Sequence, residues 1–270
     1  TLPHPPQPGP HASSRGNPDP LIAAAFRLGR SRGWRSLELR EPAPDAPNQP
    51  ASVRFYGHVV DLRGGEPALL KRLETSVARA LRKADKAGLT VRESTDLDAV
   101  RTYYRLHCLT RRRHGQPPQP WEFFAALQHH VLAAGKGFVI LVFKDEHPAA
   151  GAVFLHHGVG GLYKFGASDD NYQTWRPNNR VFWEGFRALI ARGCTALDLG
   201  RTSMANHGLR RFKLGWGSDE RIIPYVRYDL ATLSIIPTPD ATEGWHTRVF
   251  RSLPLPLAAW LGRFAYRYAA

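Results

Sequence analysis

The sequence has little cysteine and no long apolar run, and each absence argues against a class of protein. Its two cysteines, Cys108 and Cys194, are far apart and belong to no Cys-x-x-Cys or Cys/His spacing, which disfavours a disulfide framework and a zinc site. We expect both to be packing thiols. No stretch approaches the roughly 20 apolar residues that a membrane span requires, and no charged-then-apolar leader is visible, so the expected location is cytoplasmic.

Signatures of covalent and metal-dependent catalysis are also missing. There is no Gly-x-Ser-x-Gly and no cysteine with an activating histidine pattern, which disfavours a covalent acyl-enzyme. The twelve histidines include two adjacent pairs, 129–130 and 156–157. Neighbours on a helix or strand point in different directions and do not easily share one ion, so no metal is expected.

Positive charge is what the sequence has in excess. With 270 residues, of which 43% are hydrophobic, the chain can bury a substantial core, and its formal net charge is +14. Half of that excess lies between Lys71 and Arg113, where there are twelve Lys or Arg and five Asp or Glu. Such a field attracts polyanions such as tRNA, nucleotide-sugar diphosphates or anionic lipid head groups, although a solvated basic face has the same composition.

Hydrophobic periodicity and turn residues predict an α+β fold. Residues 1–20, rich in Pro, Gly, Ser and His, form a disordered or irregular arm. The elements that follow make a mixed sheet with helices on both faces, rather than a regular βαβ alternation. In order, they are a helix over 21–33, strands over 36–40 and 56–62, a helix over 66–87, a strand over 89–93, helices over 96–114 and 120–135, strands over 137–143, 149–157 and 161–166, a helix over 177–192, a strand over 195–199, a helix over 207–214 and a strand over 221–228.

Three segments carry a family resemblance. They are Ala80–Val91 (ALRKADKAGLTV), Leu162–Ala167 (LYKFGA) with Pro177-Asn178-Asn179 beyond it, and Ala196–Arg201 (ALDLGR) followed by Gly208–Gly217 (GLRRFKLGWG). In this order they resemble the GNAT superfamily, and most closely its Fem-like branch, the peptidoglycan-bridge aminoacyl transferases. The resemblance spans residues 21–229.

The resemblance implies transfer of an acyl or aminoacyl group. The donor would be acyl-CoA or aminoacyl-tRNA, and the acceptor an amine on a cell-envelope or peptidoglycan precursor, such as a nucleotide-sugar-linked one. It also implies a GNAT-like lobe over 89–229 and a partial second GNAT-like lobe over 21–88. That second lobe is incomplete because the segment before Leu21 is too short and too polar to supply its opening strands.

The donor-binding loop of a GNAT protein is glycine-rich, because backbone N–H groups at a helix N-terminus must approach phosphate closely. The equivalent stretch here, 168–179, contains no glycine. Arg176 and Arg180 offer side-chain contacts in place of the backbone. Asn178 and Asn179 are either further substrate ligands or caps of the helix start.

Asp198, Arg201 and Lys213 are the sharpest site prediction. An apolar strand ends in Asp198, and an unpaired buried carboxylate is costly, so we expect a cationic partner close by. Arg201 and Lys213 lie in the segments just beyond. The three residues either bind an anionic group and orient the attacking amine, or form a structural brace with an Asp198–Arg201 ion pair.

Amine attack on a thioester or ester needs alignment, a proton acceptor and stabilisation of the oxyanion. Strands that diverge at the sheet centre expose backbone N–H groups for the last task, and we expect segments 163–165 and 197–199 to be those strands. Tyr163 offers a hydrogen bond or a proton relay, although an aromatic residue on a central strand is more often core.

Two surfaces complete the predictions. The basic face of the 66–87 helix, centred on Arg79, Arg82, Lys83 and Lys86, is expected to bind the anionic substrate. The C-terminal extension, 230–270, is expected to be helical over 245–268. Its amphipathic part, 253–268, either packs on the body or contacts the inner face of a membrane peripherally. The rival function is a non-catalytic polyanion-binding protein on a degenerate GNAT fold, although the basic helix lacks interleaved aromatic residues.

Overall fold

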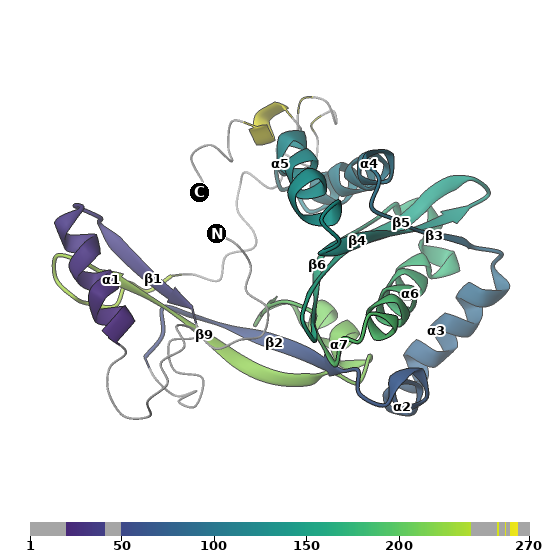
Figure 1. Cartoon of the computed structure of the whole chain (residues 1–270), viewed down its shortest axis with the longest axis horizontal. Coiled ribbons are helices and arrows are strands. Elements are labelled where there is room, and N and C mark those ends of the chain that lie inside the picture. The colour runs from purple at the N-terminus through teal and green to yellow at the C-terminus, as the bar shows by residue number, and fades with distance from the viewer. Residues whose placement is uncertain (1–19, 41–49, 239–252, 254–256, 258–259, 264–270) are drawn as a thin grey trace.

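The computed structural model describes residues 20–40, 50–238, 253, 257 and 260–263 (Figure 1). The helices of this part are α1 Pro20–Ser31, α2 Gly65–Arg72, α3 Thr75–Lys86, α4 Leu97–Arg113, α5 Trp121–Leu127, α6 Pro177–Ala191 and α7 His207–Leu214, with a π-helix at Gln128–Leu132 and a 3-10 helix at Asp170–Trp175. The strands are β1 Ser36–Arg40, β2 Val53–Asp61, β3 Thr90–Ser94, β4 Gly137–Lys144, β5 His147–His157, β6 Gly160–Ser168, β7 Ala196–Asp198, β8 Thr202–Ser203 and β9 Asp219–Asp229.

One nine-stranded mixed sheet organises the chain, as the predicted α+β fold requires. Its order is β1-β9-β2-β7-β6-β5-β4-β3, and β8 pairs with β2 beside that path. Neighbouring strands are antiparallel except β6 and β7, which are parallel. None of the helices in the described ranges is long and apolar enough to cross a membrane. Most of the predicted 245–268 helix lies outside those ranges.

Helices cover both faces of the β3–β6 half of the sheet. Figure 1 shows α4 and α5 on one face, and α6 with α3 and α2 on the other. The apolar run of β4 supplies both layers: Val139 and Leu141 are buried under α4, whereas Phe138 and Ile140 are buried under α6. This continuous run is typical of a strand covered on both sides.

Strand β2 lies inside the sheet although it comes early in the chain. Its residue Val59 pairs with Asp198 of β7 on one side and with Asp219 of β9 on the other. The predicted boundary at residue 88 therefore falls within one continuous sheet. The division into a partial and a complete lobe stays a prediction.

The single helix predicted over 66–87 is wrong, because the chain breaks between α2 and α3. Leu73 and Glu74 have extended backbone, with ψ of 135° and 147°. The N–H of Glu74 donates to the carbonyl of Gly215 at 3.0 Å. A tertiary contact with the turn after α7 thus replaces the helical hydrogen bond, which the periodicity of the segment does not reveal.

Gly185 allows α6 to pack directly on β5, and this contact gives a test of the fold. A Cβ added at Gly185 would lie 2.1 Å from Cζ of the buried Phe154 ring. We expect Gly185→Ala to lower the free energy of unfolding by about 1–3 kcal/mol, because the ring has no room to move. The matched control is Gly208→Ala in α7, where the nearest atom is 3.9 Å away and alanine favours the helix. Urea unfolding that shows G185A as stable as the parent would contradict this packing.

Candidate functional site

The parallel strands β6 and β7 separate after only three paired positions. Gly160–Leu162 pairs with Ala196–Asp198. Beyond that point β6 continues along β5 as far as Ser168, whereas the other chain turns at Gly200, with φ of 74°, and runs to β8. The predicted segment 163–165 therefore begins where the strands diverge, whereas in 197–199 the first two residues still pair and the divergence begins at Leu199. We call this the β6–β7 opening, bounded by 163–165 and 199–201.

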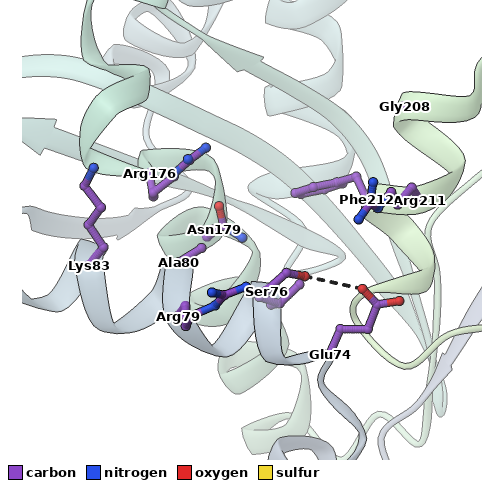
Figure 2. Close-up of a pocket in the computed structure, with 11 residues that line it drawn as sticks. Glu74, Ser76, Arg79, Ala80, Lys83, Arg176, Asn179, Gly208, Arg211 and Phe212 are labelled. Carbon is purple, nitrogen blue, oxygen red and sulfur yellow. Dashed lines mark hydrogen bonds between the residues drawn. The ribbon is translucent and has the colours of Figure 1, made fainter.

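A pocket of about 560 Å³ lies on the α6 face of the sheet, between α3, the start of α6 and α7. Figure 2 shows Arg79 and Lys83 on α3, Arg176 just before α6, and Arg211 across the pocket on α7. Asn179, 9% exposed, also lines it. The structure thus brings together four of the predicted substrate-binding residues: Arg79, Lys83, Arg176 and Asn179.

The charges of this cationic pocket are not neutralised by any carboxylate of the described residues. Among the described residues, none of Arg79, Lys83, Arg176 and Arg211 has a carboxylate within 4.0 Å. Glu74 also lines the pocket, but its carboxylate accepts a hydrogen bond from the Ser76 hydroxyl at 3.3 Å. Arg79 and Lys83 are one helical turn apart, so their like charges repel and favour a bound anion.

Arg180 and Asn178 do not join the pocket. Arg180 forms ion pairs with Asp85 of α3 and, at 3.0 Å, with Glu184 of its own helix. The Asn178 side chain donates to the hydroxyl of Ser168 at 3.3 Å and to the side chain of Gln173 at 3.2 Å. Both predicted ligands instead hold neighbouring elements in place.

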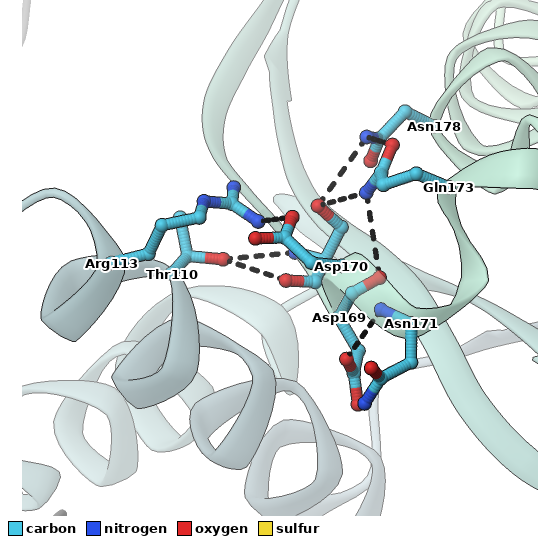
Figure 3. Close-up of polar contacts among 8 residues, drawn as sticks. Thr110, Arg113, Asp169, Asp170, Asn171, Gln173 and Asn178 are labelled. Carbon is cyan, nitrogen blue, oxygen red and sulfur yellow. Dashed lines mark hydrogen bonds and ion pairs between the residues drawn. The ribbon is translucent and has the colours of Figure 1, made fainter.

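In the glycine-free loop between β6 and α6, many backbone groups are already hydrogen-bonded to other groups of the protein. Figure 3 shows Asn171 beside Asp169, to which its N–H donates. The backbone N–H and carbonyl of Ser168 form two hydrogen bonds with the hydroxyl of Thr110 of α4. The N–H groups of Tyr172 and Arg176 donate to carbonyls of the same loop. Phosphate at the start of α6 would consequently be held by side-chain cations rather than by a backbone cradle.

Arg176 also sets the start of α6. It has left-handed backbone, with φ of 59° and ψ of 40°, and Pro177 occupies the first helical position. The alternative in which Asn178 or Asn179 caps the helix is therefore wrong, because the helix has already begun.

Asp198 and Lys213 are close enough to interact electrostatically, and both are largely buried. The carboxylate of Asp198 accepts the N–H of Gly200 at 2.7 Å. Burial raises its pKa above the ordinary value, against the opposing effects of that hydrogen bond and of Lys213. The ammonium of Lys213, 2% exposed, donates to the carbonyls of Gly200 at 2.8 Å and Arg201 at 3.2 Å. Burial lowers the pKa of Lys213 to about 8.

Arg201 points away from this pair, so the predicted Asp198–Arg201 ion pair is not formed. Its guanidinium lies 4.4 Å from the ring centroid of Phe55 and 5.1 Å from that of Tyr225. Phe55 and His58 are three residues apart on β2, so their side chains point to opposite faces of the sheet. Arg201 lies against Phe55, whereas Lys213 interacts with His58. Arg201 and Lys213 therefore lie on opposite faces of the sheet.

Sequence reasoning missed Lys164, which lies at the β6–β7 opening. The register of β5 and β6 shifts at this position, leaving Lys164 as the extra residue of a bulge. Its ammonium lies 4.8 Å from the ring centroid of Phe165, and burial, aided by the charge of Arg40, lowers its pKa to about 8. A lysine inside the apolar run LYKFGA is the sequence feature that could have identified it.

Tyr163 lies beneath α6, beside the same opening. Its ring is 4.5 Å from that of Phe182, and burial raises its pKa above the ordinary value. The hydroxyl lies over Gly166, where an added Cβ would be 1.6 Å from it. Within the described ranges the hydroxyl of Tyr163 makes no hydrogen bond to another protein group.

Solved structures give the fold an independent comparison. The crystal structure of FemX aligns with a TM-score of 0.64 at 15% identity, covering 76% of this chain and 75% of FemX. A structure of L-PGS from Bacillus licheniformis aligns with a TM-score of 0.47 at 12% identity, covering 76% of this chain and 67% of that one. At such identities the likeness to FemX concerns the fold alone, and it confirms the predicted resemblance at that level.

Sequence comparison supplies the family. A search of curated proteins finds no match. A family model described as an acetyltransferase (GNAT) domain matches residues 71–214, more than half of the chain. The matched segment includes α3, the β6–β7 opening, the start of α6 and all of α7, so it contains the pocket and both diverging strands. The chain belongs to the GNAT acyltransferase family.

Proposed function

We propose that the chain transfers an acyl or aminoacyl group from a phosphate-bearing donor to an amine of a cell-envelope precursor. The observation that carries the proposal is the cationic pocket at the start of α6, with four cations that no described carboxylate neutralises. Both acyl-CoA and aminoacyl-tRNA carry phosphates that fit such a pocket. The pocket therefore specifies a donor that carries phosphate, and binding measurements with acyl-CoA and aminoacyl-tRNA distinguish the two donors.

The donor's reactive carbonyl is expected at the β6–β7 opening. The pocket residue Phe212 packs on Phe182 with ring centroids 5.0 Å apart, and Phe182 packs on Tyr163. The pocket and the opening are therefore separated by little more than one aromatic side chain. The amine nitrogen forms a bond to the carbonyl carbon, and the bond to the thiol sulfur or ribose oxygen breaks. The leaving atom takes up the proton that the amine loses.

Tyr163 is the side chain we assign to the developing oxyanion. Its hydroxyl is a donor without a partner in the described structure, and it lies beside the diverging strands. A donor positioned in advance for a transition-state charge needs no rearrangement during the reaction. The phenol is protonated at neutral pH, as this role requires, and burial raises its pKa still further from that range.

The acceptor is expected on the α4 face, opposite the pocket. There Lys164 and Arg201 approach the β6–β7 opening from its two sides. An added Cβ at Gly200 would be 4.0 Å from the carbonyl oxygen of Tyr163, so the backbone segments on the two sides of the opening are close together. Two cations beside the aromatic rings of Phe55 and Phe165 fit an anionic acceptor, such as a nucleotide-sugar-linked one.

Lys213 and Asp198 shape the loop between these two sides. Lys213 binds the carbonyls of Gly200 and Arg201, and Asp198 binds the N–H of Gly200. We assign both a positioning role: they hold the turn that keeps β7 away from β6.

The donor site is tested by removing charge from the pocket. We expect Arg79→Gln/Lys83→Gln/Arg211→Gln to weaken donor binding at least about 30-fold, because each cation contributes a charge-assisted contact. The probes are acyl-CoA and aminoacyl-tRNA, titrated separately at equal salt. Tight binding of only one identifies the donor.

The matched control is Arg82→Gln/Lys86→Gln/Arg92→Gln, which removes the same charge from exposed positions outside the pocket. This variant should bind within about threefold of the parent. Equal losses in both variants would mean that net charge alone attracts the polyanion. Donor binding without transfer to any amine would favour the non-catalytic alternative.

The oxyanion role predicts a defect confined to the chemical step. Tyr163→Phe should lower kcat about 100-fold, the typical loss of one such donor, and change KM little. Gly166→Ala should have a similar defect, because the new Cβ must displace the tyrosine hydroxyl. Single-turnover transfer of a labelled acyl group measures both. A Y163F variant with parental kcat would assign Tyr163 to the core alone.

The buried ammonium of Lys213 predicts a pH dependence of stability. Its folded pKa of about 8 lies below the ordinary lysine pKa of 10.5, so between those limits the unfolded chain holds a proton that the folded chain has lost. Stability therefore rises with pH in this window, by up to about 1.4 kcal/mol per unit. We expect the difference in unfolding free energy, parent minus Lys213→Met, to increase from pH 8 to pH 10. A difference independent of pH would contradict the burial of the charge.

A further inference from the structure

Helix α1 lies across the far end of β1 and β9, away from the pocket and the β6–β7 opening (Figure 1). Its inner face is fixed to the sheet. The ring of Phe26 contacts that of Tyr228 edge-on, with centroids 5.0 Å apart. Gly29 is buried, and a Cβ there would meet Leu230 at 2.7 Å and Trp34 at 3.0 Å.

Large apolar side chains point outward around this contact. Leu28 is 48% exposed, Trp34 is 45% exposed and Leu233 is 50% exposed. They lie at one end of the molecule. Helix α1 packs on Leu230, and Leu233 belongs to the turn that contains Leu230, where the N–H of Leu233 donates to the carbonyl of Asp229. We call Leu28, Trp34 and Leu233 the tip patch. Exposure of three large apolar side chains at one end of the molecule does not stabilise the fold, and such patches mark surfaces that bind a partner.

Leu233 is unusual in conformation as well as in exposure. Its φ of 58° is left-handed, which favours glycine or asparagine. The turn is held by Asp229, whose carboxylate accepts the N–H groups of Ala231 and Thr232 at 2.8 and 2.9 Å. A leucine that is both strained and exposed has no benefit for the isolated fold, which points to a contact outside the chain.

The surroundings of the tip patch are strongly basic. Arg27, Arg30, Arg32 and Arg35 are exposed, and no Asp or Glu occurs between Pro20 and Leu37. In the part of the chain that is described, no carboxylate lies within 4.0 Å of these arginines. One of them, Arg30, donates to the carbonyl of Leu230 at 3.2 Å. The partner must therefore offer both negative charge and an apolar layer.

We propose that the tip patch and its arginines dock on the surface of an anionic lipid bilayer. Leu28, Trp34 and Leu233 would enter the boundary between head groups and acyl chains, while the arginines bind phosphate head groups. Basic helices with Trp and Leu on the inserted side have this chemistry. A nucleic acid would supply charge but no apolar layer for two leucines.

This docking would also place the acceptor side of the protein near the lipid. Strand β9 runs from Tyr225, beside Arg201, to Asp229 at the turn, a span of about 13 Å for four residues. The proposal itself concerns binding alone and does not depend on the transferase activity.

Vesicle co-sedimentation of the full chain tests the docking. The probes are vesicles of phosphatidylglycerol with phosphatidylcholine, and of phosphatidylcholine alone. We expect the parent to bind the anionic vesicles at least tenfold more tightly, with an affinity that falls as salt rises. Leu233→Asn should weaken binding at least about fivefold yet fold as well as the parent, because asparagine tolerates the left-handed backbone.

Two controls distinguish binding by the tip patch from non-specific hydrophobic binding and from the effect of net charge. Val159→Asn removes another exposed apolar side chain, 62% exposed in the turn between β5 and β6, and should bind like the parent. Arg27→Gln/Arg32→Gln should weaken binding more than Arg92→Gln/Arg105→Gln, which removes equal charge elsewhere. The proposal is overturned if the parent ignores anionic vesicles, if L233N binds like the parent, or if the patch instead pairs two copies that L233N separates in sedimentation.

Discussion

The short parallel contact between β6 and β7 is the constraint on which the rest of the site depends. Only three positions pair before the chain after β7 turns to join β2. That turn is possible because β2 already occupies the neighbouring place in the sheet, between β7 and β9. Lys213 and Asp198 then fix the turn at Gly200. An early strand inserted in the sheet thus creates the opening at which we propose that donor and acceptor meet.

The large positive charge divides into structural and unpaired cations. Arg180, Arg187 and Arg210 form ion pairs that tie helices to their neighbours. Cations that have no carboxylate within 4.0 Å among the described residues lie at the cationic pocket, at the β6–β7 opening and around the tip patch. Exposed ion pairs contribute little to stability, and unpaired like charges oppose it. Selection for folding alone would not produce the second group, whereas binding of anions at separate surfaces would.

Much of the fold follows from local pattern, but the site depends on tertiary contacts. The α7 helix at 207–214 and the β1 strand at 36–40 have the predicted bounds, because amphipathic periodicity and flanking glycine or proline mark them. The helix break at Leu73 and Glu74 could not be predicted, since it depends on a hydrogen bond to Gly215. Arg79 and Lys83 were identified by charge. Their convergence with Arg211 depends on how α3 and α7 pack, and periodicity holds no information about that.

The glycine-free loop before α6 changes how the donor can be held. A backbone cradle recognises phosphate through fixed N–H groups at short range, and it works with little help from net charge. Here the Asn171 N–H is engaged by Asp169, and the loop is anchored to α4 through Thr110. In the proposed function, donor recognition depends instead on exposed arginine and lysine side chains, which are mobile and screened by salt. Such a site tolerates variation in where a phosphate lies, so it suits a long polyanion that makes several contacts better than one pyrophosphate held in a single geometry.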